Sequence, residues 1–511
     1  MEKERLQILK KINLKDIIFQ VLYWIFAITI FLYFRNDVFS KVNNIIQISM
    51  VILTIGIDIL LIIANKCKLE IYKQFIILAT VLGLGYFIVT PFGSGTDEVS
   101  HFLRVFKISQ KYTNIKLQED SMFPLAFSKL IDYKNNAPEA IKKYDNYINE
   151  FEAFSMNSES KYDLIDEYWN IKLYAPIQYI PQALGVTIGR VISDNIIIIG
   201  MIGRLTGYIF WVTICALAIK IIPNKKVFFM MLCLLPINIF SAVCISGDTV
   251  TNAICMLFIA IIYRKVYLKE KISKKENILL IFLACLIALC KIVYLPLVTL
   301  VLLLKEENFE NKKSWKKFIV LTILISTIIS FAWLIVGSTK LVDSNSSSKE
   351  QMEFILKNPF EYCGIIIRTI TQKGDWFIFQ LCTGNELMCH AKTTVYPIIS
   401  YIISIALIMS LFINEEEKQL ELNNLRKIWT GLIILGTGIL IVTAIYIQWT
   451  SLFEIGKDVI EGIQGRYFIP VVSILIFIIN KTKIETNKKY LFTTIILMQL
   501  PILYQIMNVF I

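Results

Sequence analysis

The sequence predicts an all-α integral membrane protein, a bundle of about 13 transmembrane helices. Fifty-six per cent of the 511 residues are hydrophobic and only 18% are charged, whereas soluble domains are roughly 45–50% apolar and about 25% charged. Apolar runs long enough to cross a ~30 Å hydrocarbon core recur along the chain. Basic residues gather in short segments between these runs. This combination excludes an ordinary soluble enzyme, a disordered chain and a secreted disulfide scaffold.

The candidate spans are apolar runs of about 17–25 residues. In chain order they are 17–34, 45–64, 71–90, 196–222, 227–245, 249–267, 318–337, 396–413, 428–447 and 490–510, with a shorter run at 467–480.

Two further stretches need a different interpretation. Residues 278–304 are apolar but are interrupted by Lys291 and Pro296. A lysine in the middle of the bilayer costs about 2.5–3.5 kcal/mol, so we expect two short helices with Lys291 near their shared tip. Residues 173–192 contain Pro181 and Arg190, which favours a re-entrant or juxtamembrane helix over a full crossing.

The basic segments give the orientation, because Lys and Arg favour the cytoplasmic side. All of them fall on one side if the chain has thirteen spans, with the N-terminus inside and the C-terminus outside; they are 1–16, 65–70, 223–226, 264–277, 305–317, 414–427 and 481–489. The first apolar run is span-length with no small-residue cleavage site after it, so we do not expect a signal peptide. The sequence therefore predicts a multi-pass protein of a cell membrane.

This topology places two long loops, 91–172 and 338–395, on the extracytoplasmic face. We expect the first loop to be partly helical and the active face to be on this side. The predicted transmembrane module covers 1–480 with both loops, and 481–511 forms a C-terminal transmembrane helix. The net charge of +12 lies almost wholly in the cytoplasmic segments, where it meets membrane lipid and gives no support to nucleic-acid binding. Cys382 and Cys389 share the second loop, and their pairing in an oxidising exterior stays open.

The stretch PFGSGTDEVSH, residues 91–101, holds the most informative polar residues. A span ends, a turn follows, and Asp97 and Glu98 then precede His101. If a helix begins at Asp97, then Asp97, His101 and Arg104 share one face. The alternative is structural, with Asp97 capping the helix and Glu98 favouring its dipole.

Other polar residues recur at the outer ends of spans. They are Tyr179, Asp248, Lys291, Tyr294, Gln464 and Arg466. Each also has a structural interpretation as a turn, a snorkelling cation or an interface tyrosine. Together they place carboxylates and cations on one side of the bundle, and ionisable residues within membranes suggest function.

Five motifs resemble one known family. PFGSGTDEVSHFLRVFKIS, YAPIQYIPQALG, SGDTVTNAI, LCKIVYLPL and IQGRYFIP occur in this order between about residues 70 and 480. They resemble a bacterial family of large multi-spanning proteins of unknown function, which is similar to the membrane glycosyltransferases of the C superfamily (GT-C). In that superfamily an acidic pair lies in the first outer loop and a lysine at the tip of a short helical hairpin, positions matched here by Asp97/Glu98 and Lys291.

The resemblance implies an inverting transfer of a sugar from a polyprenyl phosphate to a cell-surface glycan or glycolipid, such as a cell-wall polysaccharide. Asp97 would be the general base, assisted by Glu98, and the two carboxylates could hold Mg²⁺ or Mn²⁺. Arg466, Lys291 and Arg104 would bind the donor phosphate. The substrate-binding candidates are His101, Tyr179, Asp248, Tyr294 and Gln464.

Two other functions stay open at this point. One is a transporter or flippase of lipid-linked glycans, although no inverted repeat is visible in the sequence. The other is a non-catalytic scaffold of polysaccharide assembly. The sequence leaves the sugar, the acceptor and the oligomeric state unassigned.

Overall fold

The structure is a computed structural model. It describes residues 14–34, 44–66, 69–110, 122–136, 151–156, 162–165, 171, 174–338, 346–383, 397–413, 420, 422–479, 494 and 497–506. These residues are mostly helical, as expected for an all-α membrane protein, and the named strands β1 (Met122–Pro124) and β2 (Tyr162–Leu164) form a two-stranded antiparallel sheet.

Helices occupy most of the predicted spans. They include α2 (Leu14–Phe34), α3 (Asn44–Lys66), α4 (Ile71–Val89), α9 (Ile196–Ile221), α12 (Gly247–Leu268), α15 (Lys312–Ser338), α18 (Pro397–Leu411) and α19 (Asn424–Gln448). Among the described residues, five helices are long and apolar enough to cross a membrane, or up to six if a bent pair is one span. The count of about 13 stays a prediction, as does the orientation.

The run 227–245 is not one straight span. It forms α10 (Lys226–Cys233) and α11 (Pro236–Val243), which meet at an angle of 57°. Pro236 explains the break, because its ring fixes φ and it cannot donate the helical hydrogen bond. The chain also breaks at Lys291, as the sequence predicts. There α13 (Lys274–Cys290) ends, the backbone is extended, and the short helices η5 (Ile292–Tyr294), α14 (Leu295–Val298) and η6 (Thr299–Leu303) follow.

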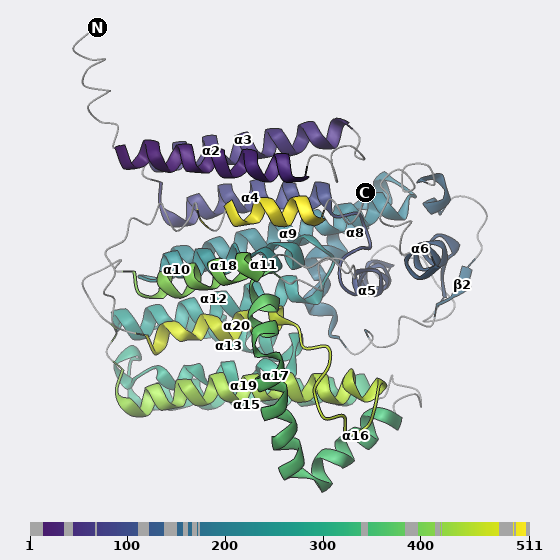
Figure 1. Ribbon diagram of the computed structural model, residues 1–511. Coiled ribbons are helices and arrows are strands. Elements are labelled where there is room, and N and C mark those ends of the chain that lie inside the picture. Colours follow the sequence, from purple (N-terminus) through teal and green to yellow (C-terminus); the bar gives the residue numbers. More distant parts are fainter. Residues whose placement is uncertain are drawn as a thin grey trace.

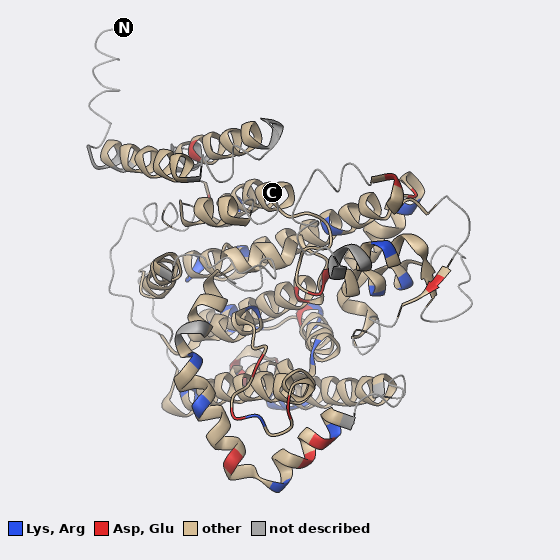
Figure 2. Ribbon diagram, turned by 45° about the vertical axis from the view of Figure 1, so that its right-hand side comes forward, with Lys and Arg blue, Asp and Glu red and all other residues tan. Residues whose placement is uncertain are grey.

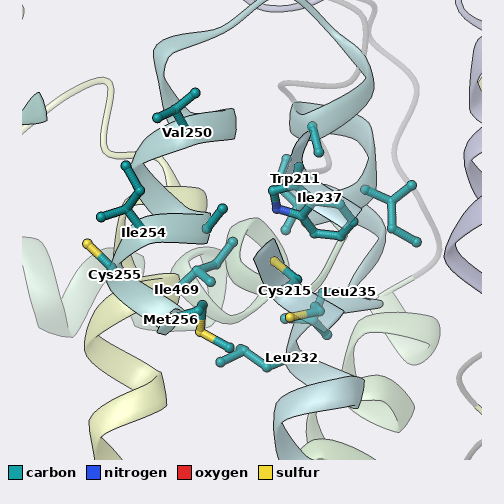
Figure 3. Packing of buried hydrophobic residues seen from close by; sticks show 14 of the residues in the cluster. Trp211, Cys215, Leu232, Leu235, Ile237, Val250, Ile254, Cys255, Met256 and Ile469 are labelled. Carbon is teal, nitrogen blue, oxygen red and sulfur yellow. The ribbon is translucent and has the colours of Figure 1, made fainter. Parts of the chain in front are cut away.

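The long helices lie side by side in a stack that begins with α2 and α3 and ends with α15 and α19 (Figure 1). Helix α12 is central, since 89% of its most apolar stretch is buried, against 17% for α15 and 22% for α19. Figure 3 shows part of the core beside it, to which Trp211 of α9, Met256 of α12, Leu232 of α10 and Ile469 of α20 (Ile469–Ser473) contribute. The exposed apolar faces of α15 and α19 suit contact with lipid.

Helix α8 (Ile180–Ile192) packs closely along α9. A Cβ at Gly185 would lie 2.0 Å from Thr206 Oγ1, and one at Gly203 would lie 2.8 Å from Val186 Cγ2. Small residues at such contacts let two backbones approach, which is how helices associate where water provides no hydrophobic drive. With 13 residues, α8 is shorter than a span, in keeping with the re-entrant or juxtamembrane interpretation.

The described part of loop 91–172 is partly helical, as predicted. Helices α5 (Glu98–Gln110) and α6 (Leu125–Asn136) lie with β1, β2 and the 3-10 turn η2 (Phe151–Phe154) at one end of the stack, on the right of Figure 1. Lys107 of α5 donates to the carbonyl of Met122 at 2.9 Å and so ties α5 to the sheet.

The second loop forms α16 (Ser346–Lys357) and α17 (Pro359–Cys382), with non-helical backbone at Lys373. Figure 2 shows few charges on the long helices, whereas α16 and α17 carry several of both signs. A connection from η8 (Thr450–Leu452) to η9 (Gly465–Phe468) packs near them, followed by α20 and η10 (Ile474–Phe477). Cys389, and hence its pairing with Cys382, lies outside the described residues.

Candidate functional site

The turn between α4 and α5 is built around the carboxylate of Glu98. Its Oε2 accepts from the backbone N–H groups of Gly93 at 3.0 Å and Gly95 at 3.1 Å, and its Oε1 accepts from Ile245 at 2.9 Å. Arg204 of α9 donates to both oxygens, through Nε at 2.6 Å and Nη2 at 2.5 Å. Both side chains are 0% exposed. This pair therefore satisfies its own charges inside the bundle.

Arg204 also fixes the end of α4. Its Nη1 donates to the carbonyl of Thr90 at 2.8 Å and its Nη2 to that of Pro91 at 2.9 Å. The guanidinium thus joins α9 to the two residues that follow α4 and, through Glu98, to the first residue of α5. The Pro/Gly-rich turn is held from inside the protein.

Asp97 differs from Glu98 in its burial, its backbone conformation and its contacts. It is half-buried, its φ is +56°, and no residue that the structure describes forms a hydrogen bond or ion pair with its side chain. A helix cap normally has an extended backbone and accepts a hydrogen bond from the helix. The left-handed backbone of a non-glycine residue is strained and is typical of functional positions.

His101 lies one helical turn beyond Asp97. Its Nδ1 is 2.7 Å from the Tyr179 hydroxyl of η4 (Pro176–Tyr179), and its ring lies 6.0 Å from that of Tyr174. Burial lowers the pKa of His101 to about 4, and burial raises the pKa of Tyr174 to about 12. Both rings are therefore neutral near pH 7.

Three charged residues from distant parts of the chain form an ion cluster. Asp248 stands in the first turn of α12, Lys291 at the break after α13, and Arg466 in η9. Lys291 Nζ is 2.5 Å from Asp248 Oδ1. Arg466 Nε is 3.0 Å from Asp248 Oδ2 without hydrogen-bond alignment, so this contact is an ion pair.

Tyr467 lies between the two cations of this cluster. Lys291 Nζ is 4.1 Å and Arg466 Cζ is 5.3 Å from the centre of its ring. Tyr294 donates to the Tyr467 carbonyl at 2.8 Å. The face of an aromatic ring attracts cations, so Tyr467 helps to stabilise the neighbouring positive charges of Lys291 and Arg466.

The three residues of the ion cluster, together with Tyr467, Asp97 and His101, line one cavity of about 810 Å³. The cluster and the Asp97 carboxylate occupy one part of its wall. Another part is formed by Lys373 of α17, Lys457 and Glu461, in which Glu461 pairs with Lys373 at 2.5 Å and with Lys457 at 3.5 Å.

The structure brings six of the predicted site residues to this cavity, namely Asp97, His101, Asp248, Lys291, Gln464 and Arg466. Tyr179 and Tyr294 stand behind the lining, where they contact His101 and the Tyr467 backbone.

Two assignments need correction. Glu98 is absent from the lining, and the chain's own donors occupy both its oxygens, so its position fits a structural role better than a catalytic or metal-binding one. Arg104 is also absent from the lining, and its Nη2 donates to the carbonyl of Tyr174 at 3.0 Å.

The expected divalent cation finds few ligands here. No group of three or more His, Cys, Asp or Glu side chains that could hold a metal occurs within the described ranges. With Glu98 and Asp248 already paired, Asp97 would supply a single carboxylate, and Mg²⁺ held in this way depends on waters and substrate phosphates for its other ligands. These residues do not fit a resident metal ion, and the chemistry below uses none.

Sequence reasoning missed two groups of residues. Arg204 lies inside a predicted span. A charge in the bilayer is costly, and this argument, which singled out Lys291, would also have indicated a role for Arg204. Lys373, Trp449 and Glu461 also line the cavity. They lie in segments that the sequence predicts as loops between spans, and no local pattern there indicates how these segments pack.

A family described as "Predicted membrane protein (DUF2142)" matches residues 80–475. The chain belongs to this family. The match begins within α4 and ends within η10, so the DUF2142 region contains the Glu98–Arg204 pair and every residue of the ion cluster. No curated protein and no solved structure matches the chain.

Proposed function

We propose that this chain is a membrane glycosyltransferase that moves a sugar from a polyprenyl phosphate to a glycan or glycolipid acceptor. One observation carries the proposal. The Asp97 carboxylate, which has no described partner, shares a cavity with two cations that must divide one carboxylate, Asp248, between them.

The roles follow from these charges. Lys291 and Arg466 together carry one positive charge more than Asp248 neutralises, which suits the phosphate of a lipid-linked donor. Asp97 accepts the proton of the acceptor hydroxyl. The acceptor oxygen then forms its bond to the anomeric carbon, and the bond from that carbon to the phosphate oxygen breaks. The electron pair leaves with the polyprenyl phosphate, whose negative charge the cations stabilise.

An apolar groove beside the cavity supports a lipid donor. It has a volume of about 650 Å³ and is lined almost wholly by apolar side chains of α14, α15 and α19. Ile292 lines the groove while its neighbour Lys291 lines the cavity, and Ala444 and Ile445 of α19 divide in the same way. A prenyl chain in the groove would bring its phosphate towards Lys291.

The decisive variant is Asp97→Asn. Asparagine tolerates the left-handed backbone at this position, so the change removes the base and preserves the turn. We expect protein in liposomes to lose about 100-fold or more of its sugar transfer from a lipid-linked donor, the typical contribution of a general base. The control is Asp458→Asn, whose side chain is 85% exposed.

The measurement is the release of polyprenyl phosphate in the presence of membrane glycans. Full activity of Asp97→Asn would remove Asp97 as the base. Movement of the intact donor across the bilayer without sugar transfer would instead make the protein a transporter.

A further inference from the structure

Three glutamine side chains face the cavity with polar atoms that have no hydrogen-bond partner among the described residues. Gln178 of η4 is 0% exposed, and both its Nε2 and its Oε1 are unpaired. Gln380 of α17 is 2% exposed with an unpaired Oε1, and Gln464, directly before η9, also has an unpaired Oε1. Folded proteins rarely leave such groups unpaired, because burial removes their bonds to water.

The backbone explains why these amides stand where they do. A Cβ at Gly247 would lie 2.5 Å from Gln178 Oε1, so Gln178 fits against the residue before Asp248. A Cβ at Gly465 would lie 2.1 Å from the carbonyl carbon of Gln380, so α17 presses against the residue before Arg466. Gln178 and the backbone of α17 therefore adjoin the residues that precede Asp248 and Arg466.

The chemistry of this wall selects the group that it can bind. An amide presents a donor and an acceptor, and can exchange their positions by turning about its last torsion. Sugar hydroxyls also donate and accept. The wall also contains Tyr467 and Trp449, whose flat rings suit the apolar face of a sugar.

We propose that Gln178, Gln380 and Gln464 bind the hydroxyl groups of a saccharide ring joined to the phosphate at Lys291 and Arg466. The inference rests on the proposed function for the phosphate, and adds which residues recognise the sugar. It makes these amides determinants of substrate specificity rather than of fold stability.

The test compares the glucosyl ester of citronellyl phosphate with its methyl ester, because both are phosphodiesters with one negative charge and the free monoester would carry a second charge near pH 7. Binding to purified protein in detergent gives the ratio of the two affinities. We expect the wild type to prefer the glucosyl ester, and Gln178→Met to reduce that preference about tenfold, the loss of one to two hydrogen bonds. The affinity for the methyl ester should stay unchanged. Gln464→Met should act in the same direction.

Thermal unfolding without ligand separates binding from structure. Gln178→Met removes unpaired buried atoms, so its melting temperature should stay level or rise. The matched control is Gln499→Met. Gln499 is also 0% exposed, but it donates to the Leu234 carbonyl at 2.6 Å and accepts from the Tyr86 hydroxyl at 2.6 Å. This control should melt earlier and keep the wild-type sugar preference.

Two results would overturn the inference while leaving the proposed function intact. One is equal affinity of the wild type for the two probes. The other is a Gln178→Met protein that melts earlier and keeps its sugar preference. A wild type that binds neither probe would instead refute the proposed function, and the sugar site with it.

Discussion

Arg204 donates to both carboxylate oxygens of Glu98, from α9 to the first residue of α5, and neither side chain is exposed. Glu98 directly follows Asp97, the residue that we propose as the base. The pair therefore holds the backbone on which that carboxylate is mounted, and it explains why one of two adjacent acids is occupied while the other faces the cavity.

Replacing Glu98 by Gln should destabilise the protein strongly. Arg204 would keep its charge in a site without water, and removing one partner of a buried ion pair costs about 3–5 kcal/mol. The melting temperature of the purified protein in detergent measures this loss. Glu353→Gln is the control, since its pair with Lys357 is exposed and should contribute about 0.3–0.5 kcal/mol. Similar effects of the two variants would contradict the structural role of Glu98.

Asp248→Asn should make the protein less stable without ligand and more responsive to phosphate. Lys291 and Arg466 would lose the carboxylate that they share, so an added anion could take its place. We expect citronellyl phosphate to raise the melting temperature of this variant more than that of the wild type. Asp58→Asn is the control, because buried Asp58 contacts Gln20 and Trp24 away from the cavity. An equal or smaller rise in Asp248→Asn would refute this arrangement.

The buried ring of His101 predicts a dependence of stability on pH. Its pKa is lowered to about 4 by burial, whereas an unfolded histidine has a pKa of about 6.5. Between these values the unfolded chain binds a proton that the folded protein does not, so the stabilisation is complete above about pH 6.5 and is lost as the pH falls towards 4. Melting temperatures from pH 7 to pH 4.5 should fall further for the wild type than for His101→Gln. Parallel curves would show that His101 takes up its proton over the same pH range in the folded and the unfolded protein.

Leu440→Trp should discriminate between donors by chain length. Leu440 lines the apolar groove eight residues before Gln448, which lines the cavity, a distance of about 12 Å along α19. An indole there should weaken a long polyprenyl phosphate about tenfold, equivalent to about two buried methylene groups at ~0.8 kcal/mol each, and leave citronellyl phosphate unaffected. Leu435→Trp is the control, because Leu435 is 61% exposed on the same helix and does not line the groove. Equal effects on both probes would exclude the groove as the path of the chain.

The sequence predicts the helical class and the position of a helix at most of the apolar runs, because twenty apolar residues in a row have few alternatives. It also locates the break at Lys291, where one charge decides the matter. The bend before Pro236 was missed although the residue was visible, because the apolar run on both sides continues. The length of the apolar run predicts one span, whereas Pro236 correctly indicates a break within it.

Six residues of the cavity wall were predictable one by one, but the pairs that they form were not. Asp248, Lys291 and Arg466 each stood out at the end of a span, yet nothing in their spacing indicates that one carboxylate serves both cations. Glu98 was interpreted with its neighbour Asp97 because adjacent acids suggest shared chemistry. Its partner Arg204 lies 106 residues further along the chain, and only tertiary packing brings the two together.

The two walls of the cavity are held by different interactions. Arg204 of α9 binds Glu98 and the turn between α4 and α5, so the side that carries Asp97 cannot shift without breaking a buried ion pair. The connection between η8 and η9 forms another side, where Glu461 makes partly exposed ion pairs with Lys373 and Lys457 while Ile460 and Ile463 are buried in a second apolar cluster. The exposed ion pairs are the contacts that a polar substrate would replace most readily, and the proposed base would act as a fixed reference point to which the acceptor is delivered.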